Sequence, residues 1–248
     1  MLDLLQFRLT TIPATASLSA VLHAVQKDYA AFGVNPELQN VASTVVGARL
    51  IGNIATIFNV GDSRAYLLTN GVEDCLVRLL SRDHTILGDK VGAGEISPDE
   101  ARSAASFLKG LSCQFIVDAK FDEFNVNIAT HELQPGERLL LCSDGLNEVL
   151  SDVEIAALLI NNSHDDPLNA CKATRRAGDT DEFSVIVLAL EDRGCSAGLA
   201  ASRFDALITT IKLLILRRRS CPCCLNTSTP SLARSSAVLC MSSFTPWH

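Results

Sequence analysis

Residues 139–146 read Leu-Leu-Leu-Cys-Ser-Asp-Gly-Leu, and this stretch decides how the chain is interpreted. The apolar run predicts a buried strand that ends at Asp144, directly before Gly145. Because glycine tolerates a tight turn, we expect the Asp144 carboxylate at an exposed strand end. A carboxylate held in this way suits a hard cation such as Mg²⁺ or Mn²⁺, which prefers oxygen ligands. The same residues are also typical of an Asx turn that closes a strand, so the stretch alone leaves both interpretations open.

Three further motifs accompany this stretch in the sequence. Residues 59–68 read Asn-Val-Gly-Asp-Ser-Arg-Ala-Tyr-Leu-Leu, residues 80–85 read Leu-Ser-Arg-Asp-His-Thr, and residues 179–188 read Asp-Thr-Asp-Glu-Phe-Ser-Val-Ile-Val-Leu. In this order and spacing, the four motifs resemble those of the PP2C-like family of metal-dependent serine/threonine protein phosphatases. The resemblance runs from about Ser17 to Leu190 and is closer to the bacterial branch of that family.

The resemblance implies an enzyme that hydrolyses phosphoserine and phosphothreonine in proteins with Mn²⁺ or Mg²⁺ in a two-metal site. By resemblance, Asp144 and Asp181 are metal ligands at strand ends, and Asp83 is the ligand of a third, weaker ion. Glu182 stands where the family has an asparagine, which adds charge and removes an amide donor. The implied partners are phosphorylated proteins, together with a paired serine/threonine kinase.

The remaining residues of the motifs are expected to have structural roles. An Asp–Arg pair in a strand bend is more often a hydrogen-bonded brace than a catalytic couple, and we apply this to Asp62-Ser63-Arg64. The residues assigned structural roles are Gly61, Asp62, Ser63, Arg64 and Gly145. His84 is exposed by pattern and is interpreted as a loop histidine with its hydrogen bonds satisfied. His23 lies beside the apolar stripe of a helix and is likewise expected to be structural. No partner for His131 is visible in the sequence.

The upstream part of the chain departs from the family pattern. The family carries a metal-binding Asp-Gly-x-Gly-Gly-His segment and a phosphate-gripping arginine before the strand that reads Ala-Ser-Thr-Val-Val here, at residues 42–46. Residues 1–41 contain one glycine, Gly33, and one histidine, His23. We therefore expect a family member without its first strands and with impaired activity. The alternative is a non-catalytic remnant or a protein-binding pseudophosphatase.

Composition limits the remaining classes of function. The last 58 residues hold seven Lys/Arg and three Asp/Glu, so residues 1–190 carry 14 Lys/Arg against 25 Asp/Glu and a net charge of −11. An acidic domain of this kind argues against nucleic acid as a partner. The longest apolar run, residues 206–216, contains Lys212 and is too short to span a bilayer, which needs about 20 residues. Four scattered cysteines in residues 1–190 suit a reducing compartment, and we expect a cytoplasmic protein.

The predicted antiparallel strands, with helices grouped between them, indicate a layered α+β fold. The resemblance implies that two stacked antiparallel sheets are flanked by helices, with the first strands of the family missing. Residues 1–190 form the truncated phosphatase domain, and the Ser- and Cys-rich residues 191–248 are expected to be a disordered tail. Residues 1–16 are expected to be irregular, and Asn70-Gly71 signals a type I′ hairpin. Helices are predicted over 17–32, from 97 onward, over 151–159 and over 167–176; strands are predicted over 43–50, 54–60, 65–68, 77–80, 124–133, 139–143 and 185–190.

Overall fold

The computed structural model describes residues 2–11, 16–34, 41–70, 75–97, 100–101, 110–117, 124–159, 185–189, 211–212, 238–241 and 244–246. Its helical elements are α1 (Leu2–Thr11), α2 (Leu18–Ala30), the 3₁₀ turn η1 (Ala31–Val34), α3 (Ile86–Gly92), α5 (Asp144–Asn147) and α6 (Asp152–Leu159). Its strands are β1 (Val41–Ser43), β2 (Val45–Ile51), β3 (Ile54–Val60), β4 (Arg64–Asn70), β5 (Cys75–Leu79), β6 (Phe115–Ile116), β7 (Asn127–Glu132), β8 (Arg138–Cys142), β9 (Val185–Ala189), β10 (Ile211–Lys212), β11 (Val238–Met241) and β12 (Phe244–Pro246).

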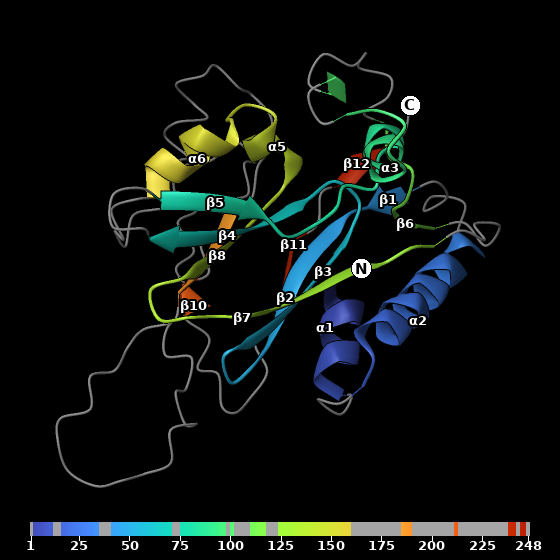
Figure 1. The fold of residues 1–248 in the computed structure, drawn as a ribbon. Helices are drawn as coiled ribbons and strands as arrows, with labels where there is room; N and C mark the ends of the chain where they lie inside the picture. Colours follow the sequence, from blue (N-terminus) through green and yellow to red (C-terminus); the bar gives the residue numbers. More distant parts are fainter. Residues whose placement is uncertain are drawn as a thin grey trace, which may run out of the picture.

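The described strands form antiparallel sheets. One sheet has the order β11-β2-β3-β7 and the other has the order β10-β9-β8-β4-β5. A smaller sheet, β12-β1-β6, adjoins the first one, because only Thr44 separates β1 from β2. Every strand pairing is antiparallel, which confirms the predicted α+β fold class (Figure 1).

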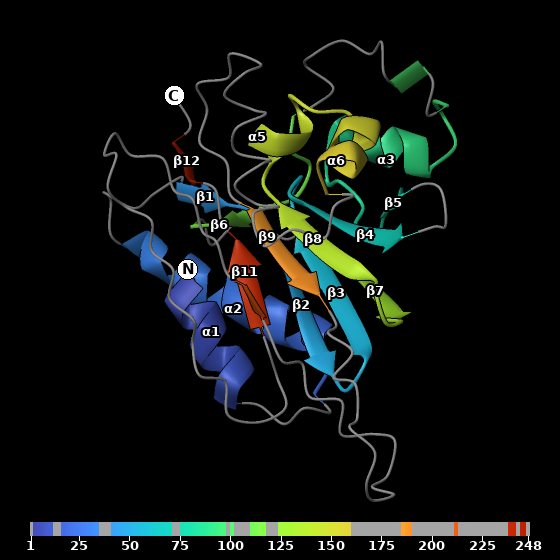
Figure 2. The same ribbon diagram turned by 90° about the vertical axis from the view of Figure 1, so that its left-hand side faces the viewer.

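The apolar residues fall into three clusters that define the layers. The first lies between the two large sheets, where Ala48 and Ile57 of one sheet pack with Leu139 and Leu141 of the other. The second joins α1 and α2 to the outer face of β2 and β3, and the third joins α5 and α6 to the outer face of β4, β8 and β9. The chain therefore builds helices outside and two sheets inside (Figure 2).

Several predicted elements are confirmed at residue level. Helix α2 begins after Ser17, whose side chain accepts a hydrogen bond from the Ala20 N–H, and it buries the predicted stripe of apolar residues. The hairpin of β2 and β3 turns at Gly52, which has a φ of 60°. A capping box also forms before α6, where the Ser151 N–H donates to Glu154 Oε2 at 2.8 Å. The predicted helix at 167–176 lies outside the described residues.

Two expectations are wrong where the structure describes the chain, and one helix was not predicted. Residues 2–11 form helix α1, which packs on α2 through Leu5 and Leu9. The β4–β5 hairpin pairs Asn70 with Cys75, so four residues connect the strands and the two-residue turn is excluded. Helix α3 was not predicted, although Thr85 caps it by accepting from the Gly88 N–H. Strands β10, β11 and β12 lie within residues 191–248, and the rest of that segment lies outside the described residues, so its expected disorder stays a prediction.

Strand β7 also differs in which face it buries. Alternation along the predicted strand 124–133 would bury Ile128, but Ile128 is 39 % exposed, while Asn127 and His131 are half-buried on the opposite face. Both inward polar side chains have partners: Asn127 Nδ2 donates to Asn59 Oδ1 at 2.9 Å, and His131 Nε2 lies 2.8 Å from Glu137 Oε2. Paired polar groups can occupy an inward face at low cost, so tertiary partners override the local alternation.

Candidate functional site

The register of three strands places the candidate site at one end of the β4-β8-β9 sheet. Arg64, the first residue of β4, pairs with Cys142, the last residue of β8, and Cys142 pairs in turn with Val185, the first residue of β9. Asp62 and Asp144 each lie two residues beyond this row, one before β4 and one after β8. Because paired strands bring these ends together, the two carboxylates lie at the same edge of the sheet.

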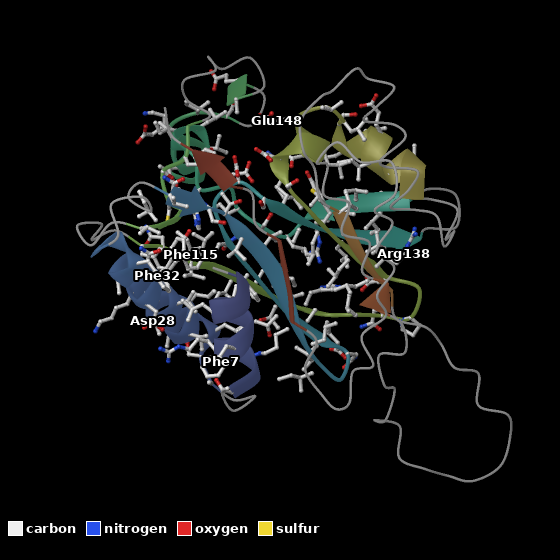
Figure 3. The ribbon with its side chains drawn as sticks, turned by 180° about the vertical axis from the view of Figure 1, so that it is seen from behind. Phe7, Asp28, Phe32, Phe115, Arg138 and Glu148 are labelled. Carbon is white, nitrogen blue, oxygen red and sulfur yellow. The ribbon has the colours of Figure 1, made fainter. Side chains whose placement is uncertain are left out.

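Asp62 and Asp144 repel each other electrostatically. Burial raises the pKa of Asp62 to about 7, and the Asp144 carboxylate is the largest charged contributor in the same direction, followed by Asp83 and Glu148. Asp62 is half-buried, so water does not fully offset this repulsion. Such a cluster of carboxylates holds negative charge that a cation can neutralise. Figure 3 shows Glu148 at the end of the molecule that carries α5 and α6.

The turn at Asp144 begins a short helix. Asp144 is the first residue of α5, and the Gly145 N–H donates to Asp144 Oδ1 at 2.9 Å. Gly145 is buried and is not among the glycines with positive φ, so it does not provide the tight turn that we expected. The Asp144 carboxylate is half-buried at the strand end.

Arg64 pairs with Asp83. Arg64 Nε lies 3.0 Å from Asp83 Oδ1, Nη2 lies 2.6 Å from Oδ2, and Nη1 donates to the Tyr66 hydroxyl at 3.2 Å. Burial alone would lower the pKa of Arg64, but the Asp83 carboxylate raises it overall. The expected Asp62–Arg64 brace is therefore not the one that forms among the described residues. The bend after Gly61 breaks the alternation that would place Asp62 and Arg64 on one face, and a bidentate carboxylate is the better partner.

The bend from Gly61 to Ser63 rests directly on Thr44. Gly61 has a φ of 103°, and a Cβ built on it would meet Thr44 Cγ2 at 2.3 Å. Ser63 Oγ and Thr44 Oγ1 lie 3.0 Å apart in a buried hydrogen bond. Gly61 is therefore required both by its backbone conformation and by close approach. This contact sets the position of the Asp62 backbone.

His84 fastens the same bend from the other side. The Gly61 N–H donates to His84 Nδ1 at 3.2 Å, and the His84 N–H donates to the Gly61 carbonyl at 2.9 Å. His84 is buried, with 7 % of its surface exposed, so the expectation of an exposed histidine is wrong, whereas its role as a satisfied loop histidine is confirmed. Burial lowers the pKa of His84. Asn59 adds to the brace by donating to the Arg82 carbonyl at 2.7 Å.

The structure thus brings together some of the residues of the four sequence motifs. Asp62 and Asp144 converge, and Asp83 lies close enough to affect the pKa of Asp62. Asp181 and Glu182 lie outside the described residues. Within the described part of the chain, no group of three or more His, Cys, Asp or Glu side chains is arranged to hold a metal ion. No described helix is long and apolar enough to cross a membrane.

Two participants were not found from the sequence. Thr44 supports the bend, but the pattern of residues around it predicts only a strand. Glu148 follows Asp144 by four residues, which places the two side chains on the same face of a helical turn. That spacing was visible in the sequence and could have identified Glu148.

Comparison with known proteins returned bacterial phosphatases. The serine/threonine protein phosphatase PstP of Mycobacterium tuberculosis is 29 % identical over 182 residues, covering 71 % of this chain and 33 % of PstP. The serine/threonine phosphatase stp of Listeria innocua is 33 % identical over 126 residues, covering 50 % of this chain and 46 % of that protein. The crystal structure of M. tuberculosis PstP/Ppp superposes with a TM-score of 0.62 at 26 % identity, covering 75 % of this chain and 79 % of that one.

The chain is similar in sequence and in fold to phosphatases of the PP2C-like family. Sequence comparison and structure comparison both return serine/threonine phosphatases of bacteria. No family model matches the chain. A structural neighbour of this PP2C-like chain, the catalytic domain of PstP, is described as a complex with two manganese ions; its TM-score is 0.58 at 26 % identity, over 75 % of this chain and 77 % of that one. The chain spans about a third to a half of the length of the two curated relatives named above.

Proposed function

We propose that this chain is a Mn²⁺- or Mg²⁺-dependent phosphatase that hydrolyses phosphoserine and phosphothreonine in proteins. The observation that carries the proposal is the convergence of Asp62 and Asp144 at one strand end, in a chain similar to phosphatases of the PP2C-like family. Two half-buried carboxylates that repel each other are stabilised when a divalent cation binds between or beside them. Similarity to that family supplies the reaction class, and the carboxylate pair supplies a place for the cation.

The donor set suits a hard cation, because Mg²⁺ and Mn²⁺ prefer oxygen ligands. Asp144 and Asp62 would hold the ion, and Glu148 lies near enough to add negative charge. Asp181 is proposed as a further ligand, since it precedes by four residues the start of β9, whose first residue is paired with Cys142. When bound, the metal would provide an activated water and offset charge on the phosphoryl group.

We propose a positioning role for Asp83 in place of the third-ion ligand that the resemblance implies. Both of its oxygens accept hydrogen bonds from Arg64, at 3.0 Å and 2.6 Å. A carboxylate engaged by a guanidinium must give up this charge-assisted pair before it can serve a metal ion. Asp83 therefore fixes Arg64 and the loop beneath the bend at Gly61.

The second candidate function is that of a non-catalytic, protein-binding family member. It is favoured by the lack, within the described residues, of any group of three or more side chains arranged for metal binding. It is also favoured by residues 1–41, whose single glycine excludes an Asp-Gly-x-Gly-Gly-His segment there. We accordingly expect the turnover of a phosphothreonine peptide to be slow even in millimolar Mn²⁺.

Calorimetric titration of the full chain with Mn²⁺, followed by assay of a phosphothreonine peptide, tests both candidates. We expect Mn²⁺ to bind and Asp144→Asn and Asp181→Asn each to weaken binding at least about tenfold, equivalent to about 1.4 kcal/mol. Asp89→Asn is the matched control, because Asp89 lies on α3 and forms an exposed ion pair with Arg82. Turnover that Asp144→Asn abolishes supports the phosphatase. Binding without turnover supports the non-catalytic member, and no Mn²⁺ binding overturns the site.

A paired serine/threonine kinase and a cytoplasmic location are part of the same proposal. They are supported by the resemblance and by the residue composition. Co-purification of a kinase that phosphorylates the same substrate protein, followed by dephosphorylation of that product by this chain, is the measurement that tests the pairing.

A further inference from the structure

The two C-terminal strands flank a single short stretch of the sandwich. Strand β11 pairs with residues 46–49 of β2, and β12 pairs with residues 41–43 of β1. Both pairings are antiparallel, and Thr44 and Val45 lie between them. β11 and β12 each occupy an edge of their sheet. The chain therefore folds back so that its last described strands meet the segment on either side of Thr44.

Thr44 is the residue on which the carboxylate bend rests. Its Oγ1 lies 3.0 Å from Ser63 Oγ, and its Cγ2 fills the space where a Cβ on Gly61 would lie. Because no room remains between Thr44 and Gly61, a shift of the backbone at Thr44 must move the bend. The bend carries Asp62, whose carboxylate is repelled by the Asp144 carboxylate.

Strands β11 and β12 also form hydrogen bonds with backbone groups at the edges of β2 and β1. A strand at the edge of a sheet presents unpaired N–H and C=O groups, which favour pairing with any extended segment. β11 covers this edge of β2, and β12 covers this edge of β1 (Figure 2). Helix α1, which packs beside α2, contacts β11 as well. The docked strands thus pair with β1 and with β2 on either side of Thr44.

We propose that β11 and β12, residues 238–241 and 244–246, act as a strap that positions the carboxylate site from the C-terminal side. Docking of the strap fixes Thr44, Thr44 fixes the bend from Gly61 to Ser63, and the bend fixes Asp62 against Asp144. Release of the strap loosens this chain of contacts and weakens cation binding. The link to cation binding rests on the proposed function, whereas docking of the strap can be tested independently of it.

Docking is tested by a cross-link at a position that the register defines. Cys240 lies directly opposite Gly47, and residues opposed in antiparallel strands have Cα atoms about 4.5–5.5 Å apart, within the range of a disulfide. Mild oxidation of full-length Gly47→Cys should therefore join positions 47 and 240, as read by peptide mapping. The double variant Gly47→Cys/Cys240→Ser is the control and should lose that linkage. Cross-linking of position 47 to other cysteines only, or to none, overturns the docking.

Coupling is tested by proline substitutions in β11. Along an edge strand, only alternate N–H groups point at the neighbouring strand, so of Leu239 and Cys240 one donates toward β2 and the other points away. We expect one of Leu239→Pro and Cys240→Pro to weaken Mn²⁺ binding about tenfold and the other to bind like the unaltered chain. Asp28→Asn, which breaks the ion pair with Arg8 on the outer helices, is the control for general destabilisation and should leave Mn²⁺ affinity unchanged.

The outcomes separate the strap from the proposed function. If the disulfide forms and both proline variants bind Mn²⁺ as the unaltered chain does, the segment docks without coupling and the inference is overturned. If Asp28→Asn weakens Mn²⁺ binding as much as the proline variants do, the effect is general destabilisation and the coupling is again overturned. If the unaltered chain binds no Mn²⁺, the proposed function fails and the coupling fails with it, while the cross-link still decides whether the strap docks.

Discussion

Arg64 holds Asp83 with two nitrogens of its guanidinium group, and Nη2 lies 2.6 Å from Oδ2. The pair joins the first residue of β4 to the loop that follows β5, and it lies directly beside the bend that carries Asp62. Their side chains are 26 % and 17 % exposed, so water only partly screens the interaction. The Arg64–Asp83 ion pair therefore stabilises the contact between β4 and the loop after β5, beside the carboxylate site.

Replacing one partner of this pair should destabilise the chain. Asp83→Asn should lower the free energy of unfolding by about 1.5–3 kcal/mol, because it leaves a partly buried guanidinium without its charged acceptor. Denaturant unfolding in the presence of a chelator measures the loss. Asp89→Asn removes an exposed partner of Arg82 and should cost less than about 1 kcal/mol. Unchanged stability of Asp83→Asn together with lost Mn²⁺ binding would show that Asp83 is a metal ligand after all.

Gly61→Ala should be among the most damaging single substitutions. The residue has a φ of 103°, and the new Cβ would meet Thr44 Cγ2 at 2.3 Å. Backbone strain and overpacking together should cost about 3 kcal/mol or more in unfolding free energy. Gly136→Ala is the matched control, since its φ is 87° but nothing lies within 4 Å of its added Cβ. That change should cost about 1 kcal/mol. Equal losses for the two variants would contradict the close approach at Thr44.

His84 should make stability depend on pH. Burial lowers the pKa of His84 below the ordinary 6.5, and the nearby Arg82 lowers it further. The carboxylates of Asp89 and Asp83 act in the opposite direction but do not outweigh burial. The unfolded chain therefore takes up the proton more readily, and stability is lost as the pH falls below about 6.5. His84→Asn keeps an acceptor near the Gly61 N–H but cannot be protonated in this range. The advantage in unfolding free energy of the unaltered chain over this variant should shrink between pH 7.5 and pH 5. A constant difference would count against the buried neutral imidazole.

Cys142 should resist alkylation in the folded chain. Burial raises its pKa to about 12, and none of its surface is exposed. Because the thiolate is the reactive form, iodoacetamide at pH 8 should leave Cys142 unmodified until the chain is unfolded. Peptide mapping with and without denaturant gives the comparison. Labelling of Cys142 in the native chain at the rate of a free thiol would show that the end of β8 opens readily.

The sequence by itself determined the antiparallel strands, the amphipathic helix α2, the start of α6 near residue 151 and the position of Asp144 at a strand end. These follow from local patterns: apolar periodicity, cap residues and turn residues act within a few positions of each other. Helix α1 and the inward face of β7 escaped prediction. The first has no cap signal, and on the second Asn127 donates to Asn59, 68 residues away, while His131 lies against Glu137 in the next turn.

Only the tertiary structure decided which charges meet at the site. Asp62 was assigned to Arg64 because the two are neighbours in the sequence, but the bend at Gly61 turns Asp62 toward Asp144, and Arg64 takes Asp83, which lies 19 residues away. Thr44, which supports that bend, lies in the first quarter of the chain, whereas β11 and β12, which pair on either side of it, lie near the end. Long-range contacts of this kind leave no local pattern, because the residues that meet are selected by packing and strand register rather than by their neighbours in sequence.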